Sequence, residues 1–219
     1  MHYYRVMQLF AQPWWVNLLL VVPFLLLYWW RSAPLSIAPA QLAWAAVFSA
    51  GFGFVEAAVV VYLRAALGLL PGYQGTLADV VRLSRGLYER GLAGAEVALP
   101  QALVTVETCR EAATIVMLVA VAALATHAAH PRVARWRERC AMFLWCFAIW
   151  DAAYYAALWA TVRWPDSLRA TDVLFLIPVP WYAQVWFPLF IDLAVLAAIL
   201  LRCRGAGGKA SATERAQAA

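Results

Sequence analysis

Seven charged side chains interrupt the apolar stretches of this sequence, and they are its residues best suited to chemistry. They are Glu56, Arg64, Glu107, Arg110, Glu111, Asp151 and Asp192. A charge at the centre of a lipid bilayer costs about 2.5–3.5 kcal/mol even on insertion scales, so such residues usually face a partner or a water-filled cavity. Carboxyl groups in that setting relay protons or bind cations.

Four of these acids fall at one predicted depth. They are Glu56, Glu111, Asp151 and Asp192. Each lies about ten residues, roughly 15 Å of helix, from the outer end of its apolar stretch. Glu107 is one helical turn from Glu111, and Arg64 is two turns from Glu56, both toward the outer surface. The pattern predicts one polar shaft that opens outward from the membrane centre.

The charges of this group do not balance. Five carboxyl groups face two arginines, and a low-dielectric site does not hold such an excess, so either some acids keep a proton or a cation joins them. The alternative is structural. In that interpretation the pairs Glu56–Arg64 and Glu107–Arg110 neutralise each other, and the two aspartates hydrogen-bond across helices.

Aromatic residues surround one of the acids. Trp150, Tyr154 and Tyr155 lie beside Asp151 in the sequence, and the spacing places at least one ring on the same helix face. With Arg64, these three residues are the predicted lining of a substrate site. Pairs of alanines follow three of the acids, which predicts that helix backbones approach closely there.

The composition shows which elements must position these residues. Of the 219 residues, 65% are hydrophobic and 13% are charged, whereas soluble domains have about 45–50% apolar and 25% charged residues. A soluble globule, a disordered chain and a disulfide-stapled secreted module are therefore excluded. The net charge of +5 does not indicate nucleic-acid binding, because most basic residues flank apolar stretches. The predicted partner is the lipid bilayer.

Five apolar stretches are long enough to cross a bilayer as helices, which takes about 20 residues. They cover residues 14–30, 43–66, 101–126, 140–162 and 181–201. The predicted fold class is therefore an all-α, polytopic integral membrane protein, with residues 1–202 as one transmembrane domain. We expect the first stretch to be a retained helix, since Trp29-Trp30-Arg31 follows it in place of the small residues of a cleavage site.

Three further segments do not fit a membrane-spanning helix. Residues 70–100 alternate apolar and charged side chains between glycines, which predicts an extracytoplasmic amphipathic helix at the membrane surface. Residues 203–219 have no apolar face and are predicted to be a disordered cytoplasmic tail. Between Trp164 and Trp181, the apolar run Val173–Ile177 is too short to span. It is expected to dip into the outer interface, to cap the polar shaft or simply to pack as a loop.

Basic residues predict the orientation. Nine Lys and Arg residues lie on the side of the 132–139 joint and six on the other side. Because cytoplasmic loops carry the excess of Lys and Arg, the C-terminus is predicted to be cytoplasmic and the N-terminus outside. The predicted location is the cell membrane, which in a bacterium is the inner membrane.

Common metal and cofactor signatures are missing from the sequence. No histidine falls inside a predicted span, and the four cysteines have no CxxC spacing, which argues against haem, histidine-ligated iron or zinc. No metal site is predicted, although a carboxylate-only site suits Mg²⁺, Ca²⁺ or Mn²⁺. The cofactor stays undetermined.

Three functions stay open at this stage. The preferred one is proton or cation handling by the polar group. The second is a membrane-embedded acid–base enzyme that acts on a lipid or isoprenoid, with the aromatic residues stabilising positive charge. The third is a non-catalytic subunit of a membrane complex, and a homo-oligomer is equally compatible with the sequence.

Overall fold

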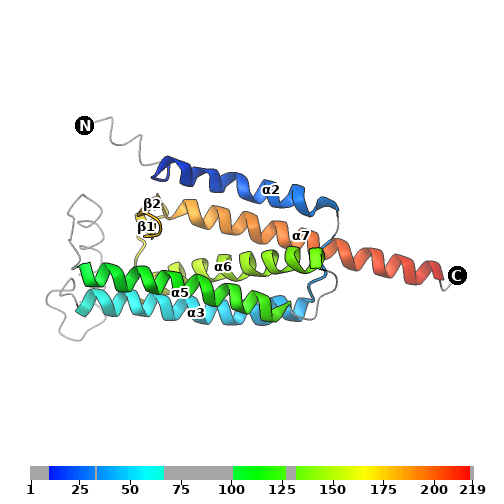
Figure 1. Ribbon diagram of the computed structural model, residues 1–219, viewed down its shortest axis with the longest axis horizontal. Helices are drawn as coiled ribbons and strands as arrows, with labels where there is room; N and C mark the ends of the chain where they lie inside the picture. Colours follow the sequence, from blue (N-terminus) through cyan, green and yellow to red (C-terminus); the bar gives the residue numbers. More distant parts are fainter. Residues whose placement is uncertain (1–9, 33, 67–100, 127–131, 218–219) are drawn as a thin grey trace.

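The computed structural model describes residues 10–32, 34–66, 101–126 and 132–217, with side chains for all of these except 63–66, 101–104, 132–135 and 204–217. The described residues form a bundle of long helices and one small sheet (Figure 1). The amphipathic helix predicted over 70–100 lies outside the described residues. The chain is mostly helical, as the sequence predicts.

The elements follow one another in a simple order. The first span combines η1 (Trp14–Val21), α2 (Val22–Trp29) and η2 (Trp30–Ser32). The other helices are α3 (Pro39–Ala66), α5 (Gln101–Ala125), α6 (Arg132–Val162) and α7 (Trp186–Gln217), and the strands are β1 (Thr171–Phe175) and β2 (Trp181–Gln184).

Five helical segments of the described chain are long and apolar enough to cross a membrane. They are Trp14–Ser32, Pro39–Tyr62, Thr105–Ala125, Trp136–Val162 and Trp186–Cys203. Large apolar side chains such as Trp44, Val116 and Leu124 point away from the bundle and are strongly exposed. Hydrocarbon is the solvent that suits such a surface, so the fold fits a multi-pass membrane protein.

Helix α6 lies at the centre of the bundle. It packs against α3, α5 and α7, while α2 packs on the far side of α7 (Figure 1). The buried core between these helices includes Trp30, Leu118, Met142 and Ile199. Residues of α3, α5 and α7 that face α6 are therefore brought together around this central helix.

The closest approach between α3 and α6 occurs at Gly53. A Cβ atom on this glycine would lie 2.5 Å from the carbonyl oxygen of Trp150, 2.9 Å from Cβ of Ala153 and 3.0 Å from the backbone nitrogen of Tyr154. Real Cβ atoms do not approach other atoms so closely. Gly53 therefore allows the two backbones to touch one turn from Glu56, which agrees with the close approach that the alanine pattern predicts.

The segment before α7 corrects part of the predicted fold. β1 and β2 pair antiparallel, with Thr171 opposite Gln184 and Val173 opposite Tyr182. The described chain is thus not purely helical, and the fifth helix begins at Trp186 rather than at 181. Backbone groups at membrane depth need partners, and this segment is too short to span as a helix, so it satisfies them by strand pairing.

Helix α7 is longer than the sequence indicates. It continues to Gln217, whereas the polar composition of 203–219 predicts disorder. Alanine, glutamate, lysine and glutamine favour helices, and adding turns to a helix that already exists costs little because its nucleus is in place. In Figure 1 this part of α7 extends beyond the rest of the bundle.

Candidate functional site

A cavity of about 60 Å³ lies between α3, α5, α6 and strand β1. Its acidic lining comes from four different elements: Glu56 on α3, Glu111 on α5, Asp151 on α6 and Asp172 on β1. A single water molecule needs about 10–15 Å³ of such volume, so the cavity has room for a few molecules of that size. We refer to it as the acidic cavity.

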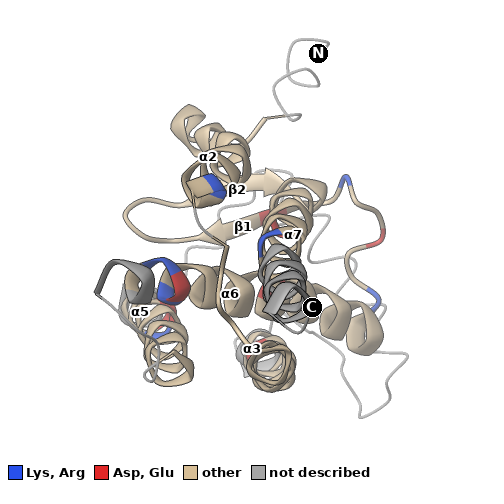
Figure 2. Cartoon of the chain, turned by 90° about the vertical axis from the view of Figure 1, so that its right-hand side faces the viewer, with Lys and Arg blue, Asp and Glu red and all other residues tan. Residues whose placement is uncertain are grey.

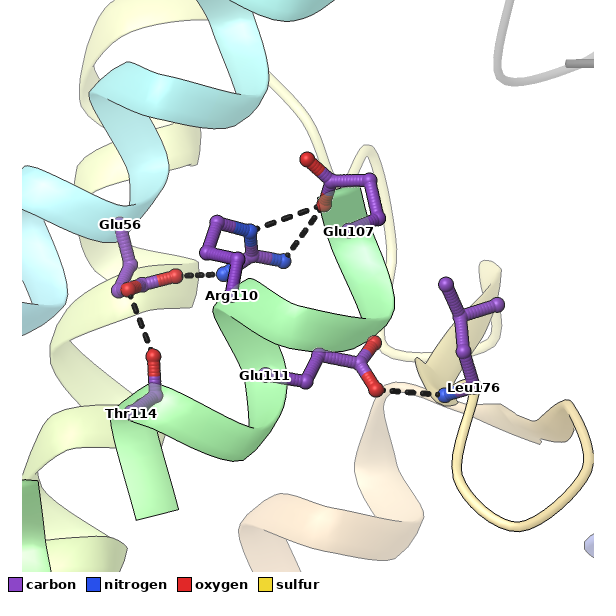
Figure 3. Close-up of polar contacts among 6 residues, drawn as sticks. All are labelled: Glu56, Glu107, Arg110, Glu111, Thr114 and Leu176. Carbon is purple, nitrogen blue, oxygen red and sulfur yellow. Dashed lines mark hydrogen bonds and ion pairs between the residues drawn. The ribbon is translucent and has the colours of Figure 1, made fainter. Parts of the chain in front are cut away.

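Arg110 joins two helices at one side of the acidic cavity. Its Nη1 contacts Oε2 of Glu56 on α3, and its Nε donates to Oε2 of Glu107 at 2.9 Å on its own helix (Figure 3). Glu56 also accepts a hydrogen bond from Oγ1 of Thr114 at 2.9 Å. Both glutamates are buried, so one arginine serves two shielded carboxylates.

Glu111 links α5 to the hairpin. Its Oε2 accepts a hydrogen bond from the backbone N–H of Leu176 at 2.9 Å (Figure 3). Leu176 directly follows β1, and Phe175 at the end of that strand stacks on Phe147 of α6 at 6.1 Å between ring centroids. These contacts hold the hairpin against the cavity, so the segment caps the polar centre, one of the arrangements that the sequence left open.

Asp151 and Asp192 form a carboxyl pair between α6 and α7. Their side chains lie within hydrogen-bonding reach of each other. The Oδ2 atom of each is shielded, and no N–H or O–H group of the described protein donates to it. Two ionised carboxylates only repel one another, so this contact is favourable when a proton lies between them.

Asp172 is a buried acid that sequence reasoning missed. It lies on β1, is 7% exposed and accepts a hydrogen bond from the Tyr155 hydroxyl at 3.0 Å. Its segment was expected at most to cap the polar shaft, and Asp172 was not counted among the acids of the shaft. The sequence did contain a signal for this residue. Asp172 directly precedes an apolar run that is too short to span a membrane, and the backbone of such a run has to pair near the bundle.

The aromatic residues predicted beside Asp151 do line the acidic cavity. Trp150, Tyr154 and Tyr155 all contribute to its wall. The rings of Trp150 and Tyr154 stack at 6.5 Å between centroids, and those of Tyr154 and Tyr155 meet edge to face at 5.3 Å. Thr114 was also missed, although it lies one turn after Glu111 and therefore shares its face.

The structure thus brings most of the predicted site residues together. Glu56, Arg110, Glu111 and Asp151 line the acidic cavity. Glu107 is connected to the cavity by its hydrogen bond with Arg110, and Asp192 is connected to it by its contact with Asp151. Glu56 contacts Arg110 of the neighbouring helix. Arg64 belongs to the last turns of α3, and its side chain lies outside the described part of the chain.

These acids are not arranged as a metal centre. Within the described residues, no group of three or more His, Cys, Asp or Glu side chains has the geometry to hold a metal ion. The acidic cavity offers instead carboxyl, guanidinium, hydroxyl and phenol groups. Of these groups, the carboxyl groups can exchange protons, while the guanidinium, hydroxyl and phenol groups hydrogen-bond to them.

Comparison with known proteins adds no family to this description. The chain matches no protein-family model, and searches of the curated proteins and of the solved structures gave no match. The fold fits the class of multi-pass membrane proteins, with five candidate spans in its described part. Its chemistry has to be argued from the acidic cavity itself.

Proposed function

We propose that this protein takes up and passes on protons within the membrane, through the carboxyl groups of the acidic cavity. The observation that carries the proposal is the Asp151–Asp192 pair. Two aspartates from neighbouring helices lie in contact, and each has an Oδ2 atom shielded from every donor of the described protein. A proton shared between them supplies the missing donor.

The charge of the surrounding groups supports the same conclusion. Among the described side chains in and beside the acidic cavity, six carry carboxyl groups and one, Arg110, carries a guanidinium. The acids are Glu56, Glu107, Glu111, Asp151, Asp172 and Asp192. Carboxyl groups crowded in a low-dielectric site favour their protonated form, because burial and neighbouring negative charges both disfavour ionisation. This crowding supports proton uptake by the acids.

A route from the pair toward the bundle end follows from the contacts. Tyr155 lies on α6, one turn from Asp151, and its hydroxyl donates to Asp172 on the hairpin. Because Asp172 lies on β1, this bond joins the central helix to the hairpin, and we assign Tyr155 and Asp172 to the hairpin side of the route.

The size of the acidic cavity argues against the enzymatic alternative. Ligand pockets for small organic molecules usually measure about 300–1,000 Å³, and this one measures about 60 Å³. An isoprenoid or a lipid acyl chain does not fit such a volume. Protons, water and single ions do fit.

Reconstituted protein tests the proposal. The full chain is incorporated into liposomes that contain a pH-sensitive dye, and a potassium diffusion potential drives proton entry. We expect a flux with the wild-type protein and its loss with Asp151→Asn, because an amide keeps the size and hydrogen bonds of the side chain but cannot exchange a proton. Asp166→Asn is the matched control, since Asp166 is exposed on the loop before β1.

Two results would contradict the proposal. One is the absence of any wild-type flux above that of empty liposomes. The other is equal flux with Asp151→Asn, Glu56→Gln, Glu111→Gln and wild type, which would leave the acids as structural links between helices. A sodium gradient applied at constant pH tests cation handling separately, because a sodium-driven flux without proton movement assigns the route to the cation.

The orientation and location are part of the proposal. We propose the cell membrane, with the N-terminus outside and the C-terminus in the cytoplasm, because nine Lys and Arg residues lie on one side against six on the other. This places the hairpin on the outer side. Reporter fusions after Ala129 and at Ala219 should both give cytoplasmic signals, and an external signal at either position would reverse the proposed direction of the route.

A further inference from the structure

The opposite end of the bundle gathers arginines around one backbone carbonyl. The oxygen of Trp30, where α2 ends, accepts a hydrogen bond from Nη2 of Arg137 on α6 at 3.2 Å and from Nε of Arg202 on α7 at 3.1 Å. Nη2 of Arg202 contacts the same oxygen. Two guanidinium groups from two helices therefore lie side by side.

A third arginine lies at the same helix end. Arg31 directly follows Trp30, is exposed, and donates from Nη2 to the Tyr28 hydroxyl at 3.1 Å. Its guanidinium also lies 4.0 Å from the centroid of the Tyr28 ring. In the end-on view of Figure 2, basic segments lie on α2 and on α7. We call Arg31, Arg137 and Arg202 the basic cluster.

The acid beside the basic cluster does not balance its charge. Glu138 follows Arg137, is 5% exposed, and accepts the backbone N–H of Ser36 at 3.2 Å. Among the side chains described at this helix end, the arginines outnumber this carboxylate. The Trp30 carbonyl is neutral, and a guanidinium has five N–H donors, so Arg202 keeps donors that the carbonyl does not use.

The surroundings place the basic cluster at headgroup depth. Tyr28 on α2 and Trp136 on α6 are strongly exposed, and Trp29 is partly exposed. Tyrosine and tryptophan side chains concentrate where hydrocarbon meets water. An anion that reaches these arginines at that depth is most simply the phosphate of a lipid.

We propose that the basic cluster binds the phosphate group of an anionic phospholipid. Arginine binds phosphate oxygens through paired N–H donors, and basic pockets between membrane helices are known to hold anionic headgroups. Arg202 and Arg137 orient the site through Trp30, and the exposed Arg31 closes it on the lipid side. This inference does not depend on the proposed proton route.

Native mass spectrometry of the purified full-length protein tests the assignment. The protein is exchanged into detergent that contains equal amounts of phosphatidylglycerol and phosphatidylcholine, and bound lipid is counted. We expect preferential retention of phosphatidylglycerol, reduced about fivefold by Arg31→Gln, because an arginine near a membrane surface contributes about 1 kcal/mol to anionic lipid binding. The Arg31 side chain donates to Tyr28 rather than to the Trp30 carbonyl, so its loss leaves the bonds of Arg137 and Arg202 at the helix junction in place.

The matched control is Arg169→Gln, which removes the same charge from an exposed position before β1. It should retain phosphatidylglycerol like the wild type. Equal retention of the two lipids, or equal loss with Arg31→Gln and Arg169→Gln, would overturn the proposal. A melting temperature that rises as much with inorganic phosphate as with phosphatidylglycerol would assign the site to free phosphate instead.

Discussion

The two polar regions of this molecule use arginine in opposite ways. At the acidic cavity, Arg110 lies between two buried carboxylates, Glu56 and Glu107. At the basic cluster, Arg137 and Arg202 share one neutral carbonyl. Arg110 has two acceptors, whereas Arg137 and Arg202 together share a single acceptor. Removal of Arg110 therefore leaves two buried carboxylates without this cation, whereas removal of Arg137 or Arg202 leaves the carbonyl with the other arginine.

This contrast is tested most strongly at Arg110. Arg110→Gln leaves Glu56 and Glu107 buried without their cation, and breaking a buried ion pair by removing one partner costs about 3–5 kcal/mol. The free energy of unfolding, measured by denaturant titration in mixed micelles, should fall by that amount. The double variant Glu56→Gln/Arg110→Gln should recover part of the loss. If Arg110→Gln unfolds like the wild type, the two regions do not differ as described.

A second prediction concerns the backbone contact under the acidic cavity. Gly53→Ala places a methyl group against the Trp150 carbonyl and Ala153, and overpacking of this kind costs about 1–3 kcal/mol. Gly51→Ala is the matched control, because nothing lies within 4 Å of its added Cβ. That variant should be neutral or slightly stabilising, since alanine favours helix over glycine. The same unfolding titration compares the two, and equal stability would contradict the close approach.

At the basic cluster the expected loss is smaller. In Arg137→Gln the Trp30 carbonyl still accepts from Arg202, so one of several hydrogen bonds is lost, at a cost of about 1 kcal/mol. Thermal unfolding in detergent should show a modest decrease. A loss as large as that of Arg110→Gln would mean that this region also depends on every charge it holds.

The smallest effect on folding is expected at the carboxyl pair. Asp151→Asn can still hydrogen-bond to Asp192 across the helices, and such bonds in membrane proteins average about 0.6 kcal/mol. The stability should therefore change by no more than about this amount, while proton flux is lost. An Asp151→Asn protein that unfolds as easily as Arg110→Gln would place the pair among the structural groups.

The length of the apolar stretches and the positions of the charged residues predict most of the fold, because both depend directly on the bilayer. The five spans emerge from hydropathy since a helix that crosses hydrocarbon needs a fixed number of apolar residues. Hydropathy does not predict the strands β1 and β2, because their pairing joins residues six to 13 positions apart across a loop. The extension of α7 to Gln217 depends on helix propagation rather than on composition.

For the site, the predicted depth of each acid indicated which acids lie together, but not which side chains they contact. The rise per residue placed Glu56, Glu111 and Asp151 at one level, and all three line the acidic cavity. Helix rotation and crossing decide which neighbour each acid meets, and a single sequence does not contain them. That is why the contact of Glu56 with Arg110 on another helix was not predicted.

The backbone contact at Gly53 has a mechanical consequence. Helices α3 and α6 touch there without side chains between them, so sliding one along the other would drive backbone atoms into each other. These two helices form a rigid frame. Any breathing motion that admits or releases an ion from the acidic cavity is therefore expected at the hairpin, which contacts the helices through the side chains of Glu111, Tyr155 and Phe147.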